Sequence, residues 1–128
     1  MIAVPITALF GSALAIVNVA LAANVSRVRS KTNLFLGTGG SPELLRAVRR
    51  HGNNAEYVAL ALVMMMLVEL NSGAPKALYG FGAALLVGRL VHAVVVDATP
   101  SALRGLSTVL TWGAIGGLGI YAGYLSMP

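Results

Sequence analysis

The stretch LLRAVRRHGNNAEYVALALVMMMLVEL, Leu44 to Leu70, joins a charged half and an apolar half in one uninterrupted segment. Its first half contains three arginines, two asparagines and one glutamate, whereas the part from Val58 to Val68 has only apolar side chains. The segment is longer than the roughly 20 residues that a helix needs to cross a bilayer. It therefore predicts a transmembrane helix whose first turns are polar.

The composition places the whole chain in the same class. Hydrophobic residues make up 57% and charged residues 10% of the 128 residues, and the mean hydropathy is +0.81. Because soluble domains carry about 25% charged residues, we expect an integral membrane protein. Four apolar segments predict helices at residues 1–25, 42–70, 76–96 and 101–125. Their short connections favour one antiparallel four-helix bundle over residues 1–128, an all-α membrane fold.

The basic residues fall mainly on one side of this predicted bundle. Six of the nine lie between Arg27 and Arg50, and Arg104 starts the fourth helix on the same side. Lys76 lies in the opposite connection. By the positive-inside rule, we expect the basic side to face the cytoplasm and both termini to face the periplasm of a bacterial inner membrane. Because the 1–25 segment precedes its basic residues, we expect a membrane span rather than a cleaved signal peptide.

Charge and cysteine content exclude several kinds of chemistry. The net charge of +5 could suggest nucleic acid, but the basic residues lie at helix ends without interleaved aromatic residues. We therefore expect no nucleic-acid partner. The absence of cysteine excludes disulfides, thiolate metal sites and a protein thiol nucleophile, so any sulfur chemistry must use a sulfur that a ligand brings.

The second helix carries three signals at its start. Ser41 is suited to cap the first turn, Pro42 fits the first helical position, and Glu43 is favourable at the positive end of the helix dipole. Glu69, near the other end of this helix, is expected to reach water or Lys76. In the last helix, five glycines form a small-residue face that favours tight helix packing: Gly113, Gly116, Gly117, Gly119 and Gly123.

A polar stripe is expected along the first half of the 42–70 helix. Its members are spaced three, four and three residues apart: Arg46, Arg49, Asn53 and Glu56. With 3.6 residues per turn, this spacing places them on one face, bordered by Arg50 and Tyr57. A charge facing lipid would cost at least ~2.5 kcal/mol, so we expect the stripe to point toward other helices.

Two interpretations of this stripe remain open. Arg49 and Glu56 can neutralise each other while Asn53 forms a hydrogen bond between helices. Alternatively, the arginines bind an anionic ligand, because Arg89 and Arg104 on the later helices add more positive charge than a single glutamate balances. Ionisable residues inside a membrane usually mark functional sites, which favours the ligand.

The residues from Arg46 to Tyr57 closely resemble the R-x-x-R-x-x-x-N-x-x-E-Y signature of the MAPEG family, the membrane-associated proteins in eicosanoid and glutathione metabolism. The resemblance covers essentially the whole chain and is closest to the small bacterial branch. Further stretches in the other three helices support the resemblance: Arg27 and Arg29 at the end of the first, the segment from Gly88 to His92 with Arg89 in the third, and Arg104 in the fourth.

The resemblance implies a homotrimer that binds glutathione between neighbouring subunits near the cytoplasmic face. Family enzymes conjugate glutathione to lipophilic electrophiles or reduce lipid hydroperoxides, with glutathione as cosubstrate and no metal. Arg104 would stabilise the glutathione thiolate, and Arg27 or Arg29 would come from the adjacent subunit. The remaining glutathione-binding residues implied are Arg46, Arg49, Asn53, Glu56, Tyr57, Arg89 and His92.

The chemistry of glutathione agrees with these implied roles. Its two carboxylates suit arginine forks such as Arg46 and Arg49, and its ammonium suits Glu56. Only the thiolate of a cysteine attacks, and its pKa is about 8.5 when free. A guanidinium beside it, here Arg104, would raise the reactive fraction, at about 1.4 kcal/mol per unit of pKa.

Two positions depart from the family pattern. The third helix of family members commonly carries two tyrosines one turn apart, where this chain has His92 and Val96. His92 can act as a hydrogen-bonding group or an acid or base, or it can be a hydrogen-bonded packing residue. The missing tyrosines leave the reaction type open. A noncatalytic lipid-binding or scaffold protein of the same fold is therefore the alternative.

Overall fold

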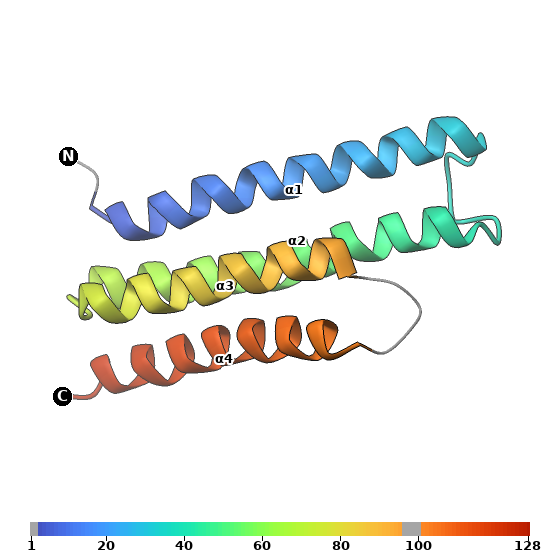
Figure 1. The fold of residues 1–128 in the computed structure, drawn as a ribbon. Coiled ribbons are helices and arrows are strands. Elements are labelled where there is room, and N and C mark those ends of the chain that lie inside the picture. The colour runs from blue at the N-terminus through green and yellow to red at the C-terminus, as the bar shows by residue number, and fades with distance from the viewer. Residues whose placement is uncertain (1–2, 96–100) are drawn as a thin grey trace.

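The protein is a bundle of four long helices, shown in Figure 1. The computed structural model describes residues 3–95 and 101–128, and these residues contain no strand. The helices are α1 (Pro5–Thr32), α2 (Pro42–Leu70), α3 (Pro75–Val95) and α4 (Ala102–Leu125). Each is long and apolar enough to cross a membrane. The predicted all-α membrane bundle is thus confirmed, and α1 starts at the same end of the bundle at which α4 finishes.

The helices pack around a central apolar core. α1 contacts α2 and α3, α4 contacts the same two helices, and α1 and α4 do not meet anywhere in the described residues. Leu14, Met65, Leu85 and Leu118, one from each helix, are completely buried. Because the core needs only one face of each helix, the opposite faces of α1 and α4 stay open to the surroundings.

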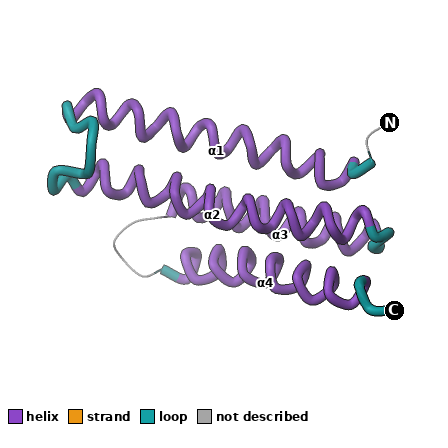
Figure 2. The backbone as a smooth tube through the Cα atoms, turned by 180° about the vertical axis from the view of Figure 1, so that it is seen from behind, coloured by secondary structure: helices purple, strands orange, loops and turns teal. Residues whose placement is uncertain are grey.

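The helices differ in length, which gives the bundle a step at one end. α1 has 28 residues and α3 has 21, which at 1.5 Å per residue corresponds to about 42 and 32 Å. The last turns of α1 and the first turns of α2 therefore project past the end of α3 and the start of α4 (Figures 1 and 2).

The first helix extends beyond its predicted end at Val25. It continues to Thr32 because the polar segment still packs against α2, where Val28 is 2% exposed and clusters with Leu44 and Ala47. The charges thus end the apolar segment without ending the helix.

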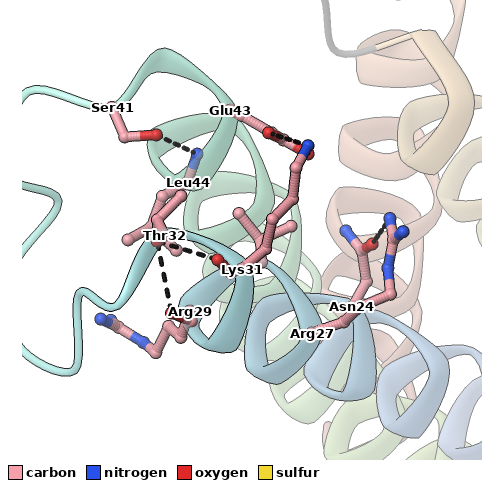
Figure 3. A network of polar contacts seen from close by, with 9 residues as sticks. Asn24, Arg27, Arg29, Lys31, Thr32, Ser41, Glu43 and Leu44 are labelled. Carbon is pink, nitrogen blue, oxygen red and sulfur yellow. Dashed lines mark hydrogen bonds and ion pairs between the residues drawn. The ribbon is translucent and has the colours of Figure 1, made fainter.

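Side chains tie the α1–α2 connection together at the projecting end (Figure 3). Asn33 ends α1 in the left-handed conformation, which is favourable for a helix cap. Arg29 Nη1 donates hydrogen bonds to the carbonyl oxygens of Leu34, at 2.9 Å, and Gly37, at 3.1 Å. Lys31 Nζ forms an ion pair with Glu43 Oε2 at 2.9 Å, which links the end of α1 to the start of α2.

The predictions for the cap at the start of α2 and for Glu69 near its end have different outcomes. Ser41 Oγ accepts a hydrogen bond from the Leu44 amide at 3.3 Å, so the predicted cap at Pro42 is confirmed. Glu69, however, forms no ion pair with Lys76 among the described residues. Its carboxylate oxygens accept hydrogen bonds from the α1 amides of Ile6, at 2.8 Å, and Thr7, at 2.7 Å. The reason is that the first turn of α1 has unpaired amides and a positive dipole end, and it has no cap of its own.

The prediction that the five glycines of α4 pack against another helix is wrong for four of them within one chain. A Cβ at Gly117 would collide with Phe81, but a Cβ at the other four glycines would meet no heavy atom within 4 Å. Close helix contact occurs instead at Gly88 of α3, where a Cβ would lie 2.9 Å from Thr111 Oγ1. Gly88 therefore lets α3 approach α4 beside the polar residues described next.

Candidate functional site

A small polar pocket lies where α2, α3 and α4 meet. Its volume is about 160 Å³. The residues that line it are Asn53, Tyr57, Arg89, His92, Arg104, Thr108, Thr111 and Trp112. Five of these were predicted from the sequence, although they come from three helices and are up to 51 positions apart, from Asn53 to Arg104.

Arg89 is the buried cation of this pocket. It is 2% exposed, its Nη2 donates a hydrogen bond to Asn53 Oδ1 at 2.8 Å, and its guanidinium carbon lies 5.7 Å from the centre of the Tyr57 ring. No carboxylate pairs with it in the part of the chain that the structure describes, and its Nε is buried without a hydrogen-bond partner there. Because burying an unpaired charge is costly, this arrangement indicates a site for an anion.

Trp112 and Tyr57 supply two aromatic rings to the pocket lining. Trp112 Nε1 donates a hydrogen bond to the Tyr57 hydroxyl at 3.2 Å, which connects α4 to α2. Sequence reasoning missed Trp112, Thr108 and Thr111. Their spacing from Arg104 was the available signal, because residues four, seven and eight positions later return to the same side of a helix.

The side chains of the polar stripe of α2 point in two different directions. Asn53 and Tyr57 line the pocket, whereas Arg46, Arg49 and Glu56 are exposed on the surface of the subunit. The prediction that the whole stripe points toward the other helices is therefore wrong for these three within one chain. The physical reason is that successive helix residues point about 100° apart, so Glu56 turns away where Tyr57 turns inward.

The pairing of Arg49 with Glu56, one of the two interpretations of the stripe, does not occur among the described residues. The ion pair found there joins Lys31 to Glu43 instead. Arg46 belongs to the first turns of α2, which project beyond α3 and α4, so burial against other helices is not needed to keep it away from lipid.

The two arginines near the end of α1 do not line the pocket of their own chain. Arg29 holds the α1–α2 connection through the carbonyl groups named above. Arg27 is exposed, and its Nη2 donates a hydrogen bond to Asn24 Oδ1 at 2.9 Å, as Figure 3 shows. Of the two, Arg27 is thus the arginine whose guanidinium faces outward from the bundle.

A pair of asparagines, one of them buried, joins α2 to α1. Asn54 is 1% exposed, and its Nδ2 donates a hydrogen bond to Asn18 Oδ1 of α1 at 3.2 Å. The sequence analysis did not single out this pair, although Asn18 stands out as an amide inside an apolar helix. The pair links α1 to α2 and takes no part in the pocket.

His92 lines the pocket and is partly buried. Its side chain forms no hydrogen bond with another described residue, so the hydrogen-bonded packing contact, one of its two expected roles, is not seen there. Val96, the other departure from the family pattern, lies outside the described residues.

The fold and the site define a helical membrane protein with a cationic pocket. A family model for the MAPEG family matches residues 7–124, and the chain belongs to this family. The chain is similar to the inner membrane protein YecN of Escherichia coli strain K12, at 34% identity over 87 residues, and to YecN of strain O6:H1 at the same identity. These matches cover 68% of the chain and 66% of each relative, so the chain spans slightly less than two thirds of their length. No solved structure matches the chain.

Proposed function

We propose that the protein binds glutathione at the polar pocket and uses it as cosubstrate against lipophilic electrophiles or lipid hydroperoxides in the membrane. The observation that carries this proposal is Arg89, a buried guanidinium that is held by a neutral amide and has no carboxylate partner among the described residues. An anionic ligand would complete its interactions. Membership of the MAPEG family supports glutathione as that ligand.

The residues of the pocket fit part of glutathione. Arg89 suits one of its carboxylates, and Arg104 suits a second negative group. Asn53 and Tyr57 add groups that can donate or accept hydrogen bonds. Glu56, which suits the ammonium group, is on the outer surface of the same helix. A single chain therefore offers the right groups, but on two separate surfaces.

A neighbouring subunit would join these surfaces. The pocket of about 160 Å³ is smaller than the roughly 300–1,000 Å³ of typical small-molecule sites. In the homotrimer proposed here, the outward face of Arg46, Arg49 and Glu56 contacts the next subunit, and that subunit contributes Arg27. Arg27 fits this role better than Arg29, because Arg29 is already bound to the connection of its own chain.

Arg104 is the residue proposed to activate the sulfur. Glutathione supplies a thiol that either bonds to an electrophilic carbon with loss of HX, or reduces a hydroperoxide to an alcohol and water while two molecules form a disulfide. Arg104 would stabilise the negative sulfur by its permanent charge. His92, in the pocket wall, would form a hydrogen bond with the bound glutathione. The rings of Tyr57 and Trp112 would exclude water.

The proposed setting is a bacterial inner membrane. The relatives named inner membrane protein YecN support this location. The charged α1–α2 end, with most of the basic residues, would face the cytoplasm, and the termini would face the periplasm. The pocket opens near that end, so glutathione would reach it from the cytoplasm.

Binding of glutathione tests the proposal directly. In calorimetric titrations of purified protein, we expect Arg89→Met to weaken glutathione binding at least tenfold, about 1.4 kcal/mol, because the variant removes the buried charge and keeps an apolar volume. Lys76→Met, a cation outside the pocket, should bind like the original protein. Equal binding by both variants would remove the pocket from the proposal.

Catalysis is tested separately with chlorodinitrobenzene as the electrophile. We expect Arg104→Ala to lower the conjugation rate about a hundredfold, with Arg104→Lys in between. If the protein binds no glutathione at all, the noncatalytic lipid-binding or scaffold function replaces this proposal.

A further inference from the structure

Arg89 is a buried positive charge that has to be balanced also when no glutathione is bound. Its side chain is 2% exposed, no carboxylate pairs with it among the described residues, and its buried Nε donates to none of them. Leaving a buried charge uncompensated is strongly unfavourable. We therefore expect a negative ion in the polar pocket in the state without glutathione.

The groups around Arg89 offer hydrogen-bond donors to such an ion. Asn53 accepts the hydrogen bond of Arg89 with its Oδ1, so the two hydrogens on its amide nitrogen remain. The Tyr57 hydroxyl accepts a hydrogen bond from Trp112 Nε1 at 3.2 Å and donates none to a described residue, so its own hydrogen remains. Both residues line the pocket together with Arg89. Three side chains can thus donate to one anion.

The charge of the site favours an ion with a single negative charge. Arg89 supplies one positive charge without a described partner. Arg104 also lines the pocket but already has an interaction of its own, so the count of charges rests on Arg89. A divalent ion such as phosphate would replace an excess of positive charge by an excess of negative charge, which is also costly in a buried site.

The size and the remaining lining of the pocket favour a small ion. The cavity of about 160 Å³ is several times the roughly 30 Å³ of one water molecule, which leaves room for a halide ion and a few waters. Thr108 Oγ1 and Thr111 Oγ1 donate their hydrogens to carbonyl oxygens of α4, at 3.0 and 2.8 Å. They therefore offer no further donors for the several oxygens of a larger anion.

We propose that a small monovalent anion of the halide class, such as chloride, occupies the pocket as the counter-ion of Arg89, and that a carboxylate of glutathione displaces it. The exchange replaces one anion by another, so the buried charge stays neutralised when glutathione leaves. The displacement rests on the proposed function, whereas binding of the small anion does not depend on glutathione.

Trp112 allows the anion to be detected in the unmodified protein. It is the single tryptophan of the chain and lines the pocket, and iodide quenches tryptophan fluorescence on contact. The protein is placed in phosphatidylcholine nanodiscs in gluconate buffer, whose anion is much larger than a halide, and is titrated with iodide at constant ionic strength. We expect quenching that saturates and that chloride reverses, above a linear background from the exposed side of the ring.

Three variants separate the pocket from other causes of quenching. Arg89→Met should weaken the saturable component by roughly tenfold or more, because the charge is lost. Asn53→Asp should weaken it similarly while keeping the arginine, since the new carboxylate takes the place of the anion, so the test does not depend on the folding of the first variant. Lys76→Met, which removes an exposed cation outside the pocket, should titrate like the original protein. The uncharged quencher acrylamide should act similarly on all four proteins.

Two measurements distinguish the anion site from the proposed function. Iodide quenching that stays linear, or saturable quenching that persists unchanged in Arg89→Met, would overturn the anion site. In calorimetric titrations, added chloride should raise the apparent Kd of glutathione, and a Kd that is independent of chloride would refute the displacement. Saturable quenching in a protein that binds no glutathione would support the anion site while refuting the proposed function.

Discussion

Arg89 and Asn53 are joined across α3 and α2 by a hydrogen bond of 2.8 Å from Nη2 to Oδ1. The partner is an amide oxygen, which orients the guanidinium but does not neutralise it. A carboxylate at the same place would form a charge-assisted pair and satisfy the arginine within the chain. The neutral partner therefore keeps the positive charge of Arg89 available to a ligand.

The variant Asn53→Asp tests this relationship. The new carboxylate should pair with Arg89, so we expect glutathione binding to weaken at least tenfold while thermal stability is maintained or raised. Asn71→Asp introduces the same charge at the exposed far end of α2 and should leave binding within about twofold, a small fraction of the tenfold step. Unchanged binding in Asn53→Asp would mean that the ligand does not need the charge of Arg89.

Trp112 and Tyr57 should be energetically coupled through their hydrogen bond between α4 and α2. We expect a double-mutant cycle of Trp112→Phe and Tyr57→Phe, measured by unfolding in mixed micelles, to show a coupling of about 0.5–1.5 kcal/mol. The phenylalanines keep most of the ring packing, so the coupling reports the hydrogen bond. Strictly additive effects would contradict the 3.2 Å contact.

Glu69 should contribute more to stability than Glu43, although both are glutamates of α2. Glu69 accepts two backbone hydrogen bonds at the positive end of α1, so we expect Glu69→Ala to lower the unfolding free energy by about 1–2 kcal/mol. Glu43→Ala should lose clearly less, because its ion pair with Lys31 is exposed to solvent screening. Circular dichroism during denaturation in micelles measures both, and equal losses would contradict the capping role.

Arg29 should protect the α1–α2 connection from proteolysis. We expect Arg29→Gln to increase cleavage within residues 33–40 several-fold, because the carbonyl groups of Leu34 and Gly37 lose a charged donor. Arg27→Gln is the control, since Arg27 bonds only within α1. Limited proteolysis followed by mass spectrometry locates the cleavage, and similar rates in both variants would refute the role of Arg29.

Features that depend on nearby residues were predictable from the sequence. Ser41, Pro42 and Glu43 act within one helical turn, and the predicted start of α2 is where the structure places it. The apolar segments indicated the four helices because length and composition alone decide that property. The signature of α2 also led to five residues that the fold brings into one pocket.

Features that depend on a distant partner were not predictable. The hydrogen bonds of Glu69 to α1 require knowing which helix end lies beside it, and residues 6 and 69 are far apart in the chain. The spacing of the α2 stripe identified a shared side of the helix, but it could not say which edge of that side faces α3. The position of that neighbour leaves Asn53 partly buried and bonded to Arg89, whereas Glu56 is exposed.

The step between the long and short helices has a consequence for how two reactants meet. Arg104 lies in the first turn of α4, beside the place where the shorter helices stop and the longer ones continue. A compound dissolved in water can approach Arg104 along the projecting ends of α1 and α2. A compound dissolved in the hydrocarbon of a membrane can approach it from the side of the bundle. In the proposed function, a water-soluble thiol and a lipophilic substrate would thereby meet at one guanidinium.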